Sequence, residues 1–198
     1  MASLDMNRLM DNARIRLPGA LDTAIQYELF SVMNEFFQNS NCWKEDITVP
    51  VVSTITSYDI TPTMGVINRL LYLVDSNGYP QGAGMSTPGT IDLLVAPAIA
   101  DTWTATVGLT VTDPITRDGY PEFPAWILNK YGNDLLDGVL GRMMSQLAKP
   151  YSNQQLAIYH LKRFQGAISQ AKVEAQHANV YRAQAWSFPS SFNRSRRR

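Results

Sequence analysis

The chain has 198 residues, of which 45% are hydrophobic and only 17% charged, so it is long enough for one well-buried core or for two small lobes that share one. Its 17 basic and 17 acidic residues cancel, yet every charged residue after Glu174 is an arginine, so the charge is polarised along the chain. A single cysteine, Cys42, excludes an internal disulfide and a cysteine-based zinc cluster, and we expect a buried or half-buried structural thiol.

Charged residues interrupt every apolar run at the N-terminus, and no run approaches the eighteen or so apolar residues that a membrane-spanning helix needs. The sequence therefore predicts neither a secretory signal nor a membrane span. We expect a protein that is made and used in a reducing, aqueous compartment.

Two amphipathic helices are predicted in the first forty or so residues. Between Leu21 and Phe37 the apolar residues recur at helical spacing, and Asp22 is suited to the positive end of the helix dipole. A shorter helix is predicted upstream, before the sequence LPG breaks the pattern. Its apolar face is formed by Met6, Leu9, Met10 and Ala13.

From Ile47 to about Thr112 the hydrophobic period changes to two, which is typical of strands. In WTATVGLTVT, residues 103–112, one face is apolar and the other consists of threonine and glycine, which predicts a half-exposed strand. Extended segments are also predicted at 47–60, where Pro50 indicates a sheet edge, and at 66–75 and 90–95. A small antiparallel sheet is therefore expected between helical segments.

The glycine-rich stretch GYPQGAGMSTPGT, residues 78–90, is interpreted as a long hairpin loop. A phosphate-binding loop would require a lysine followed by serine or threonine at the start of a helix. This stretch has no such lysine, and the segment that follows it is a predicted strand.

The helical period returns after Pro124, which is predicted to occupy the first position of a helix. Gly138 and Gly141 within this helix indicate a close crossing with another helix. Its apolar face is predicted to contain Ile127, Leu128, Tyr131, Leu135, Leu136, Val139, Leu140, Met143, Met144 and Leu147.

A corner then leads into a last helix that extends to about Ala178. It is predicted to run antiparallel to the helix that follows Pro124. Ser152 is predicted as its N-cap in a capping box with Gln155, and Tyr151 is predicted to pack on Leu156. The apolar face of this helix is predicted to contain Leu156, Tyr159, Phe164, Ala167, Ile168, Ala171 and Ala175.

Catalytic groups are sparse, and we expect neither an enzyme nor a metal or cofactor site. His160 and His177 are too far apart on one helix to share a metal, so each is interpreted as structural or merely exposed. The closest acidic pairs are Glu45 with Asp46, placed in a turn, and Asp134 with Asp137, on a helix. Both pairs are interpreted as solvated surface groups.

The C-terminal arm, residues 181–198, has no regular pattern and combines aromatic residues with arginines. Four arginines near the end could neutralise nucleic-acid phosphates, or the end could simply be a solubilising tail. An electrostatic DNA-binding tail has no need of three large rings, so docking onto a protein partner is favoured. The candidate docking residues are Trp186, Phe188, Pro189, Phe192, Arg194, Arg196, Arg197 and Arg198.

Two thirds of the sequence resembles the head-to-tail adaptor, or connector, proteins of tailed bacteriophages, in particular short-tailed ones. The similar features are a tryptophan that opens a helix after a proline, the small-residue stretch DGVLGRMM, the corner KPYSN and the helix with YHLKRFQGAI. Residues 13–47 are similar to the opening helix of the same family and its tryptophan.

The resemblance implies a structural virion protein that forms a ring of about twelve copies under the portal protein. Such a ring extends the channel through which DNA passes without sequence-specific binding, and it provides a platform for the tail or nozzle protein. The arm would then be the portal anchor, and the protein, made in the host bacterial cytoplasm, would lie in the neck of the virion with no membrane partner.

The fold expected from the pattern and the resemblance together is of the α+β class. It is a bundle of an N-terminal helix and two long C-terminal helices, residues 1–45 and 121–180, with an antiparallel β domain at 46–120 inserted between them and an extended arm at 181–198. The alternatives are a DNA-binding protein that uses its arginine-rich tail, another ring component of the neck or tail, and a tail-associated hydrolase, which would need an acidic pair in a cleft.

Overall fold

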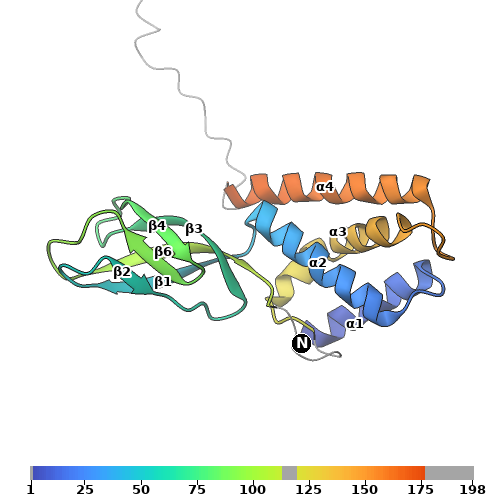
Figure 1. The fold of residues 1–198 in the computed structure, drawn as a ribbon, viewed down its shortest axis with the longest axis horizontal. Helices are drawn as coiled ribbons and strands as arrows, with labels where there is room; N and C mark the ends of the chain where they lie inside the picture. Colours follow the sequence, from blue (N-terminus) through green and yellow to red (C-terminus); the bar gives the residue numbers. More distant parts are fainter. Residues whose placement is uncertain (1, 113–119, 177–198) are drawn as a thin grey trace, which may run out of the picture.

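The computed structural model describes residues 2–112 and 120–176, which form four helices and two small three-stranded antiparallel sheets, a mixed α+β structure (Figure 1). The helices are α1 (Ala2–Arg16), α2 (Asp22–Ser40), α3 (Ala125–Met144) and α4 (Gln154–Gln176). The strands are β1 (Lys44–Val51), β2 (Ser57–Asp59), β3 (Val66–Val74), β4 (Ala83–Thr87), β5 (Thr90–Leu93) and β6 (Asp101–Thr110).

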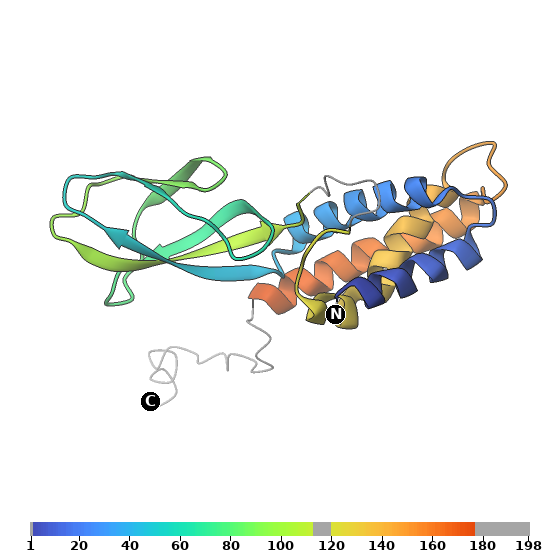
Figure 2. The same ribbon diagram turned by 90° about the horizontal axis from the view of Figure 1, so that it is seen from below.

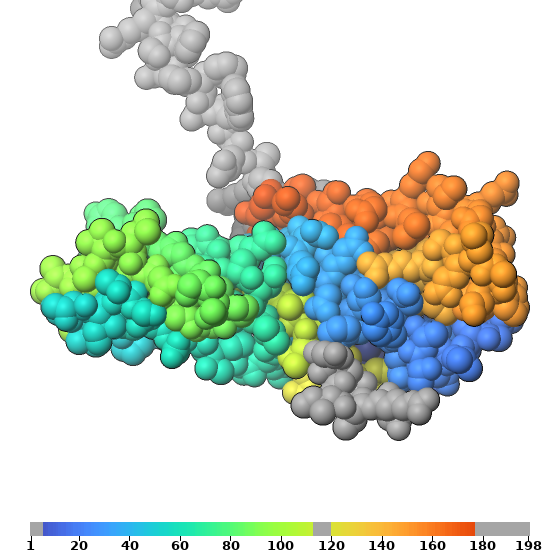
Figure 3. All heavy atoms as spheres, in the orientation of Figure 1, coloured from blue at the N-terminus to red at the C-terminus, as the bar shows by residue number. Residues whose placement is uncertain are grey.

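Helices and strands lie at opposite ends of an elongated molecule, called here the helical part and the sheet part (Figures 1 and 2). Helix α2 leads into β1, and in the pairing of β1 with β6 Lys44 lies opposite Gly108 while Val51 lies opposite Asp101. Strand β1 therefore runs away from the helices and β6 returns to them. In the space-filling view the two parts meet midway along the molecule (Figure 3).

Helix α3 lies in the middle of the helical part and packs against the other three helices. A side-chain carbon built at Gly138 would lie 2.6 Å from Val32 of α2 and 3.0 Å from Phe164 of α4, and one at Gly141 would lie 2.7 Å from Leu161. The close crossing predicted from these two glycines is confirmed. Phe36 of α2 also packs at this crossing, with its ring centroid 6.2 Å from that of Phe164.

The predictions for the first two helices are confirmed, with one exception. The upstream helix exists, and its predicted apolar face is buried. Helix α2 begins at Asp22 and continues to Ser40, three residues beyond the predicted end. Leu21 precedes the helix as its N-cap and is exposed, because the chain turns there between α1 and α2.

The ends of α3 differ from the prediction. Pro124 is the N-cap, with extended backbone angles, so the first helical residue is Ala125. The helix ends at Met144, and Leu147, which the pattern assigned to the buried face, lies beyond the last turn and is exposed. The other nine residues of the predicted face are buried.

The corner before α4 is built differently from the predicted capping box. Asn153 is the capping residue, since its side-chain oxygen accepts a hydrogen bond of 3.1 Å from the backbone N–H of Leu156. Ser152 instead donates its hydroxyl hydrogen bond to the carbonyl of Gln146, which closes the loop after α3. Tyr151 is buried but Leu156 is exposed, so the predicted contact between them does not anchor the helix.

The buried face of α4 is rotated from the predicted one. Tyr159 is exposed although it was assigned to the core, whereas Phe164, Ile168 and Ala171 are buried as predicted. At the glycines of α3, the large side chains Phe164 and Leu161 of α4 occupy the space that a side chain on α3 would need. The buried residues of α4 are Ala157, His160, Phe164, Ile168 and Ala171.

The strand orders are β1-β6-β3 and β2-β5-β4, so residues 2–112 form two sheets where one was predicted. Pro50 lies in β1, at the edge of the first sheet as expected. The glycine-rich stretch read as a loop contains β4, which pairs antiparallel with β5. That strand was missed because its sequence, AGMST, lacks the bulky alternation that marks a strand.

Strand β6 has one face as predicted, with Trp103, Ala105, Val107, Leu109 and Val111 all buried along it and just after it. The other face was expected to be exposed, but it is partly covered. Thr106 and Thr110 are buried, and their hydroxyls donate hydrogen bonds to Asp46 and Asn34. The two threonines are covered because β6 is the central strand of its sheet and the end of α2 packs against it.

Candidate functional site

The eight candidate docking residues of the arm, from Trp186 to Arg198, lie outside the described residues, as does His177. What the structure does show is where the described part of the chain ends. Helix α4 ends at Gln176 beside the first residue of β1, because Lys44 Nζ donates a hydrogen bond of 2.7 Å to the carbonyl of Ala175. The last described residues therefore lie where the helical part meets the sheet part.

A groove of about 260 Å³ lies at this meeting point and is called here the junction groove. Trp126 from the first turn of α3 is 43% exposed and Tyr72 from β3 is 52% exposed. Two large rings are thus left partly uncovered beside the end of α4. The residues that line the groove are Cys42, Lys44, Asp46, Tyr72, Thr106, Trp126 and Ala175.

Cys42 in this groove fits the expectation of a structural thiol. It is half-buried, and burial raises the pKa of its thiol to about 11. At neutral pH almost all of the thiol is therefore protonated, which makes it a poor nucleophile. Cys42 is thus unsuited to covalent catalysis in this environment.

Apolar side chains are exposed at the two far ends of the molecule. At the end of the sheet part, the segment between β5 and β6 exposes Leu94, Val95 and Ile99; at the end of the helical part, Ile15, Leu21 and Leu147 are exposed. Each of the six is at least 72% exposed. Exposed apolar side chains that gather at one end of a molecule can serve as contacts with other proteins.

A buried polar cluster joins α3 to α4. His160 Nδ1 lies 2.8 Å from Asp137 Oδ1, and Arg163 Nε lies 3.1 Å from the second carboxylate oxygen. Both His160 and Asp137 are buried, so the interpretation of Asp137 as a solvated surface group is wrong. Asp134 is less deeply placed, and burial together with the neighbouring Asp137 raises its pKa.

The sequence carried a signal for His160, which continues the spacing of Ala157, Phe164 and Ile168 along one helical face. The sequence carried no signal for the burial of Asp137, because a carboxylate within an apolar run interrupts the hydrophobic pattern. Its partner lies 23 residues away on another helix. The cluster holds two helices together, and its histidine and carboxylate point at each other.

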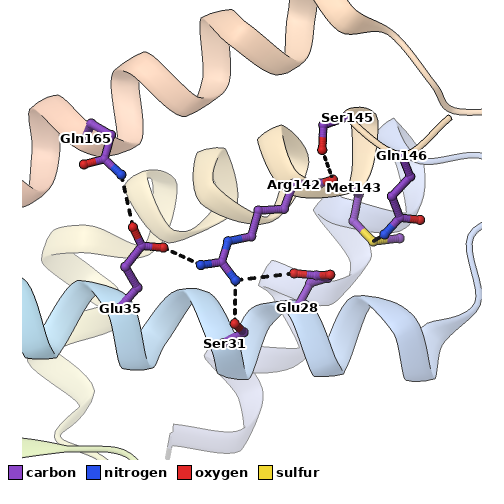
Figure 4. Close-up of polar contacts among 8 residues, drawn as sticks. All are labelled: Glu28, Ser31, Glu35, Arg142, Met143, Ser145, Gln146 and Gln165. Atoms are coloured by element: carbon purple, nitrogen blue, oxygen red, sulfur yellow. Dashed lines mark hydrogen bonds and ion pairs between the residues drawn. The ribbon is translucent and has the colours of Figure 1, made fainter.

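A second polar cluster joins three helices around Arg142 of α3 (Figure 4). The guanidinium donates to Ser31 and Glu35 of α2 and lies 3.5 Å from Glu28. Gln165 of α4 donates a hydrogen bond of 3.1 Å to the other oxygen of Glu35. The hydrogen bonds of this cluster fix the relative positions of α2, α3 and α4.

The other acidic pair also differs from its interpretation, because Glu45 and Asp46 lie on β1 and not in a turn. Glu45 accepts hydrogen bonds from the backbone N–H and the hydroxyl of Thr63, and Asp46 accepts one from Thr106. Adjacent residues of a strand point to opposite faces, so the two carboxylates do not form a pair.

Among residues 2–112 and 120–176, no group of three or more histidine, cysteine, aspartate or glutamate side chains is arranged to hold a metal ion. In the same part of the chain, no helix is long and apolar enough to cross a membrane. Comparison with known proteins found no family model and no curated protein that matches the chain.

Proposed function

We propose that the protein is a structural head-to-tail adaptor of a tailed bacteriophage, acting without catalysis. It forms a ring under the portal protein, extends the DNA channel and provides the platform for the tail. In this proposal the helices form the body of the subunit, the strands form an inserted domain, and the arm at 181–198 reaches the portal.

The observation that carries the proposal is that an elongated subunit (Figure 1) exposes large apolar side chains near both of its ends. A protein that links two assemblies needs two separate surfaces, and a ring needs two different faces that meet between neighbours. Exposed apolar side chains supply the binding free energy for such contacts, since each Å² of apolar surface that is buried contributes roughly 25 cal/mol. An isolated subunit gains nothing from exposing them.

A second support comes from the residues on which the family resemblance rests, because several of them have structural roles. The small residues Gly138 and Gly141 allow the close crossing of α3 with its neighbours. Asn153 in the KPYSN corner caps α4. Trp126 opens α3 directly after the Pro124 cap and Ala125. These residues determine how the helices pack and therefore the shape of the helical part. The contacts between the subunits of a ring depend on that shape.

The proposed portal anchors are the aromatic and basic residues of the arm, from Trp186 to Arg198. The last five basic residues give the arm a charge of +5, and residues 1–174 carry 17 acidic against 12 basic residues, or −5. Aromatic rings in pockets would supply most of the affinity, and the arginines would orient the arm on acidic groups of the partner.

The test is co-sedimentation with the cognate portal ring. The full-length chain is compared with one that ends at Ala185, and we expect only the full-length chain to bind with a fixed stoichiometry. Equal binding by both would show that the arm serves another partner. Absence of binding by either would overturn the adaptor proposal.

Matched full-length variants separate the two kinds of anchor. In one, Trp186, Phe188 and Phe192 are replaced by serine; in the other, Arg194, Arg196, Arg197 and Arg198 are replaced by glutamine. The aromatic variant should lose binding at all salt concentrations. The arginine variant should bind more weakly at low salt and approach the unmodified protein at high salt, where screening removes the electrostatic contribution.

The concentration of arginine at the end of the arm favours DNA binding as a second candidate function. That function predicts binding to duplex or single-stranded DNA that weakens steeply with salt and disappears when the last five residues are removed. Titration of labelled DNA at 50 and 200 mM salt distinguishes it from portal docking.

A further inference from the structure

Helices α1 and α3 pack against each other, and a groove of about 180 Å³ lies between them, called here the α1–α3 groove. Three of its lining residues, Leu9, Leu128 and Leu136, are buried members of the core. The groove is therefore built on the packed interface of the two helices. Its other lining residues are Arg8, Asn12, Asn129, Lys130, Gly132 and Asn133.

The polar side chains of this groove are cations and carboxamides, and none of its described lining residues is acidic. A guanidinium and a carboxamide each offer several N–H donors. The ammonium of Lys130 lies 2.8 Å from Glu174 and shares its charge with that carboxylate, so Arg8 is the main cation of the groove. N–H donors gathered around a guanidinium suit an oxyanion.

Gly132 lies in the interior of α3 without a reason in the packing of the subunit. A side-chain carbon built there would have its nearest neighbour, Leu128, at 4.0 Å, whereas one at Gly138 would lie 2.6 Å from Val32. Glycine in a helix costs about 1 kcal/mol relative to alanine, and the φ of Gly132 does not require it. A glycine also lets a ligand approach the backbone closely, which accounts for its place in the groove.

We propose that the α1–α3 groove binds a phosphate group, with Arg8 as the charged contact and the carboxamides of Asn12, Asn129 and Asn133 as neutral donors. Arginine and asparagine side chains are both common phosphate contacts in proteins that bind nucleic acid. A phosphate presents oxygens in several directions, so it fits donors that come from two helices on either side of a groove. The DNA backbone and free phosphate offer this same chemistry.

The contact is weak, which suits DNA that slides past the protein. A single main cation releases few counterions from DNA, and the neutral carboxamides add hydrogen bonds without releasing more. In an adaptor ring, the groove assigns the α1–α3 face to the DNA channel. Only this assignment rests on the proposed function, because phosphate binding itself is a property of the single chain.

The test is an NMR titration of the full-length protein at constant ionic strength, with inorganic phosphate and, separately, with a short DNA duplex. The backbone amide of Gly132, assigned by its loss in Gly132→Ala, reports on the groove itself and not on binding elsewhere in the chain. We expect this resonance to shift in a saturable way with both probes. A shift with inorganic phosphate alone would identify free phosphate as the ligand and remove the assignment of this face to the channel.

Two arginine variants separate the groove from the general charge of the protein. Arg8→Gln should weaken phosphate binding roughly tenfold, the factor expected for loss of a hydrogen bond between charged groups. Arg16→Gln, on the same helix, removes the same charge, but Arg16 does not line the groove, so binding should be unchanged.

Two glycine variants separate binding from stability. Gly132→Ala should raise the thermal midpoint, because alanine favours the helix, and yet weaken phosphate binding roughly three- to tenfold, since the added methyl group takes the place of the ligand. The backbone amide of Asn133 is the reporter in this variant. Gly166→Ala on α4 should also raise the midpoint, but Gly166 does not line the groove and phosphate binding should be unchanged.

Two outcomes overturn the proposal. A Gly132 amide that stays in place with both probes would mean that the groove holds no phosphate. Equal weakening by Arg8→Gln and Arg16→Gln would mean that net charge, and not the groove, attracts the anion. Either result would leave the portal experiment unaffected, since these measurements use the protein without the portal.

Discussion

In the helical part, carboxylates lie against cations. Arg14 Nε lies 2.8 Å from Asp22, and Lys130 Nζ lies 2.8 Å from Glu174. The pKa values of Asp22 and Glu174 are lowered mainly by these hydrogen-bonded cations. These two carboxylates of the helical part are thus stabilised by opposite charge.

In the sheet part, carboxylates are held by neutral donors. Asp92 accepts hydrogen bonds from Ser57 and the backbone of Ser86, and Asp101 accepts them from the backbone of Thr102 and the hydroxyl of Ser76. These bonds lower the pKa values of both carboxylates. Residues 44–112 contain six acidic and two basic residues, so cations are scarce there.

The difference teaches that the two parts depend on different conditions. Ion pairs between exposed groups weaken in salt, whereas hydrogen bonds from neutral donors to a carboxylate are much less screened. The parts are nonetheless packed together through Phe37 of α2, whose ring lies 5.5 Å from that of Trp43. The backbone carbonyl of Trp43 in turn accepts a hydrogen bond of 3.0 Å from Leu109 in β6.

The largest effect is expected from Phe36→Ala, which tests whether the two parts unfold together. Phe36 is fully buried, with its ring 5.1 Å from that of Tyr131, and its removal should destabilise the protein by about 3–5 kcal/mol. Native-state hydrogen exchange, read separately for amides of α3 and β6, measures the free energy of unfolding in each part. We expect both to fall by the same amount, since the parts share one core.

Tyr27→Ala on the same helix is the control, because Tyr27 is exposed and its loss should change stability by less than about 0.5 kcal/mol. If the amides of β6 keep their protection in Phe36→Ala, the sheet part is an independent folding unit. The comparison between the parts would then be one between two domains.

A smaller loss of stability is expected from a substitution at Gly138, and Gly166 serves as a control for which a gain is expected. Gly138→Ala adds a carbon 2.6 Å from Val32 and should destabilise the protein by about 1–3 kcal/mol. Gly166→Ala on α4 has nothing within 4 Å of the new carbon and should stabilise it by about 0.5–1 kcal/mol. Urea denaturation measures both. Stabilisation by both substitutions would contradict the close crossing of the helices.

The sequence predicts the elements well where large apolar side chains carry the pattern. The buried faces of α1, α2 and α3 and the apolar face of β6 follow from periodicity alone. Prediction fails where helices cross closely. There the glycines of α3 admit Phe164 and Leu161 of α4. The buried face of α4 also contains Ala157 and His160, which bonds to Asp137, while Leu156 and Tyr159 face outward.

The sheet part was predicted less completely, for a related reason. Burial of Thr106 and Thr110 depends on partners far along the chain, Asp46 and Asn34, which no local pattern identifies. Strand β4 exists because β5 pairs with it. For the candidate site, the sequence indicated the aromatic and basic composition of the arm, but the junction groove is assembled from five separate strands and helices and their connections.

The smallest effects concern the carboxylates, and they sharpen the comparison between the parts. A carboxylate whose pKa is lower in the folded than in the unfolded protein contributes stability above its unfolded pKa, and the contribution is lost as the pH falls through the folded value. For Asp101, lowered from 3.8, the loss should therefore begin near pH 4 and continue below it. Thermal unfolding midpoints measured from pH 5 to pH 2 should fall, and they should fall less in Asp101→Asn.

Salt separates the two kinds of carboxylate. At pH 7, Asp22→Asn and Asp101→Asn should each lower the thermal midpoint at low salt. In 1 M salt, where the Debye length is about 3 Å, the effect of Asp22→Asn should shrink because the Arg14 pair is exposed and screened. The effect of Asp101→Asn should persist, because the amide nitrogen of asparagine cannot accept the hydrogen bonds that Ser76 and Trp103 donate to Oδ2. Equal sensitivity of both variants to salt would mean that the sheet part also depends on long-range charge.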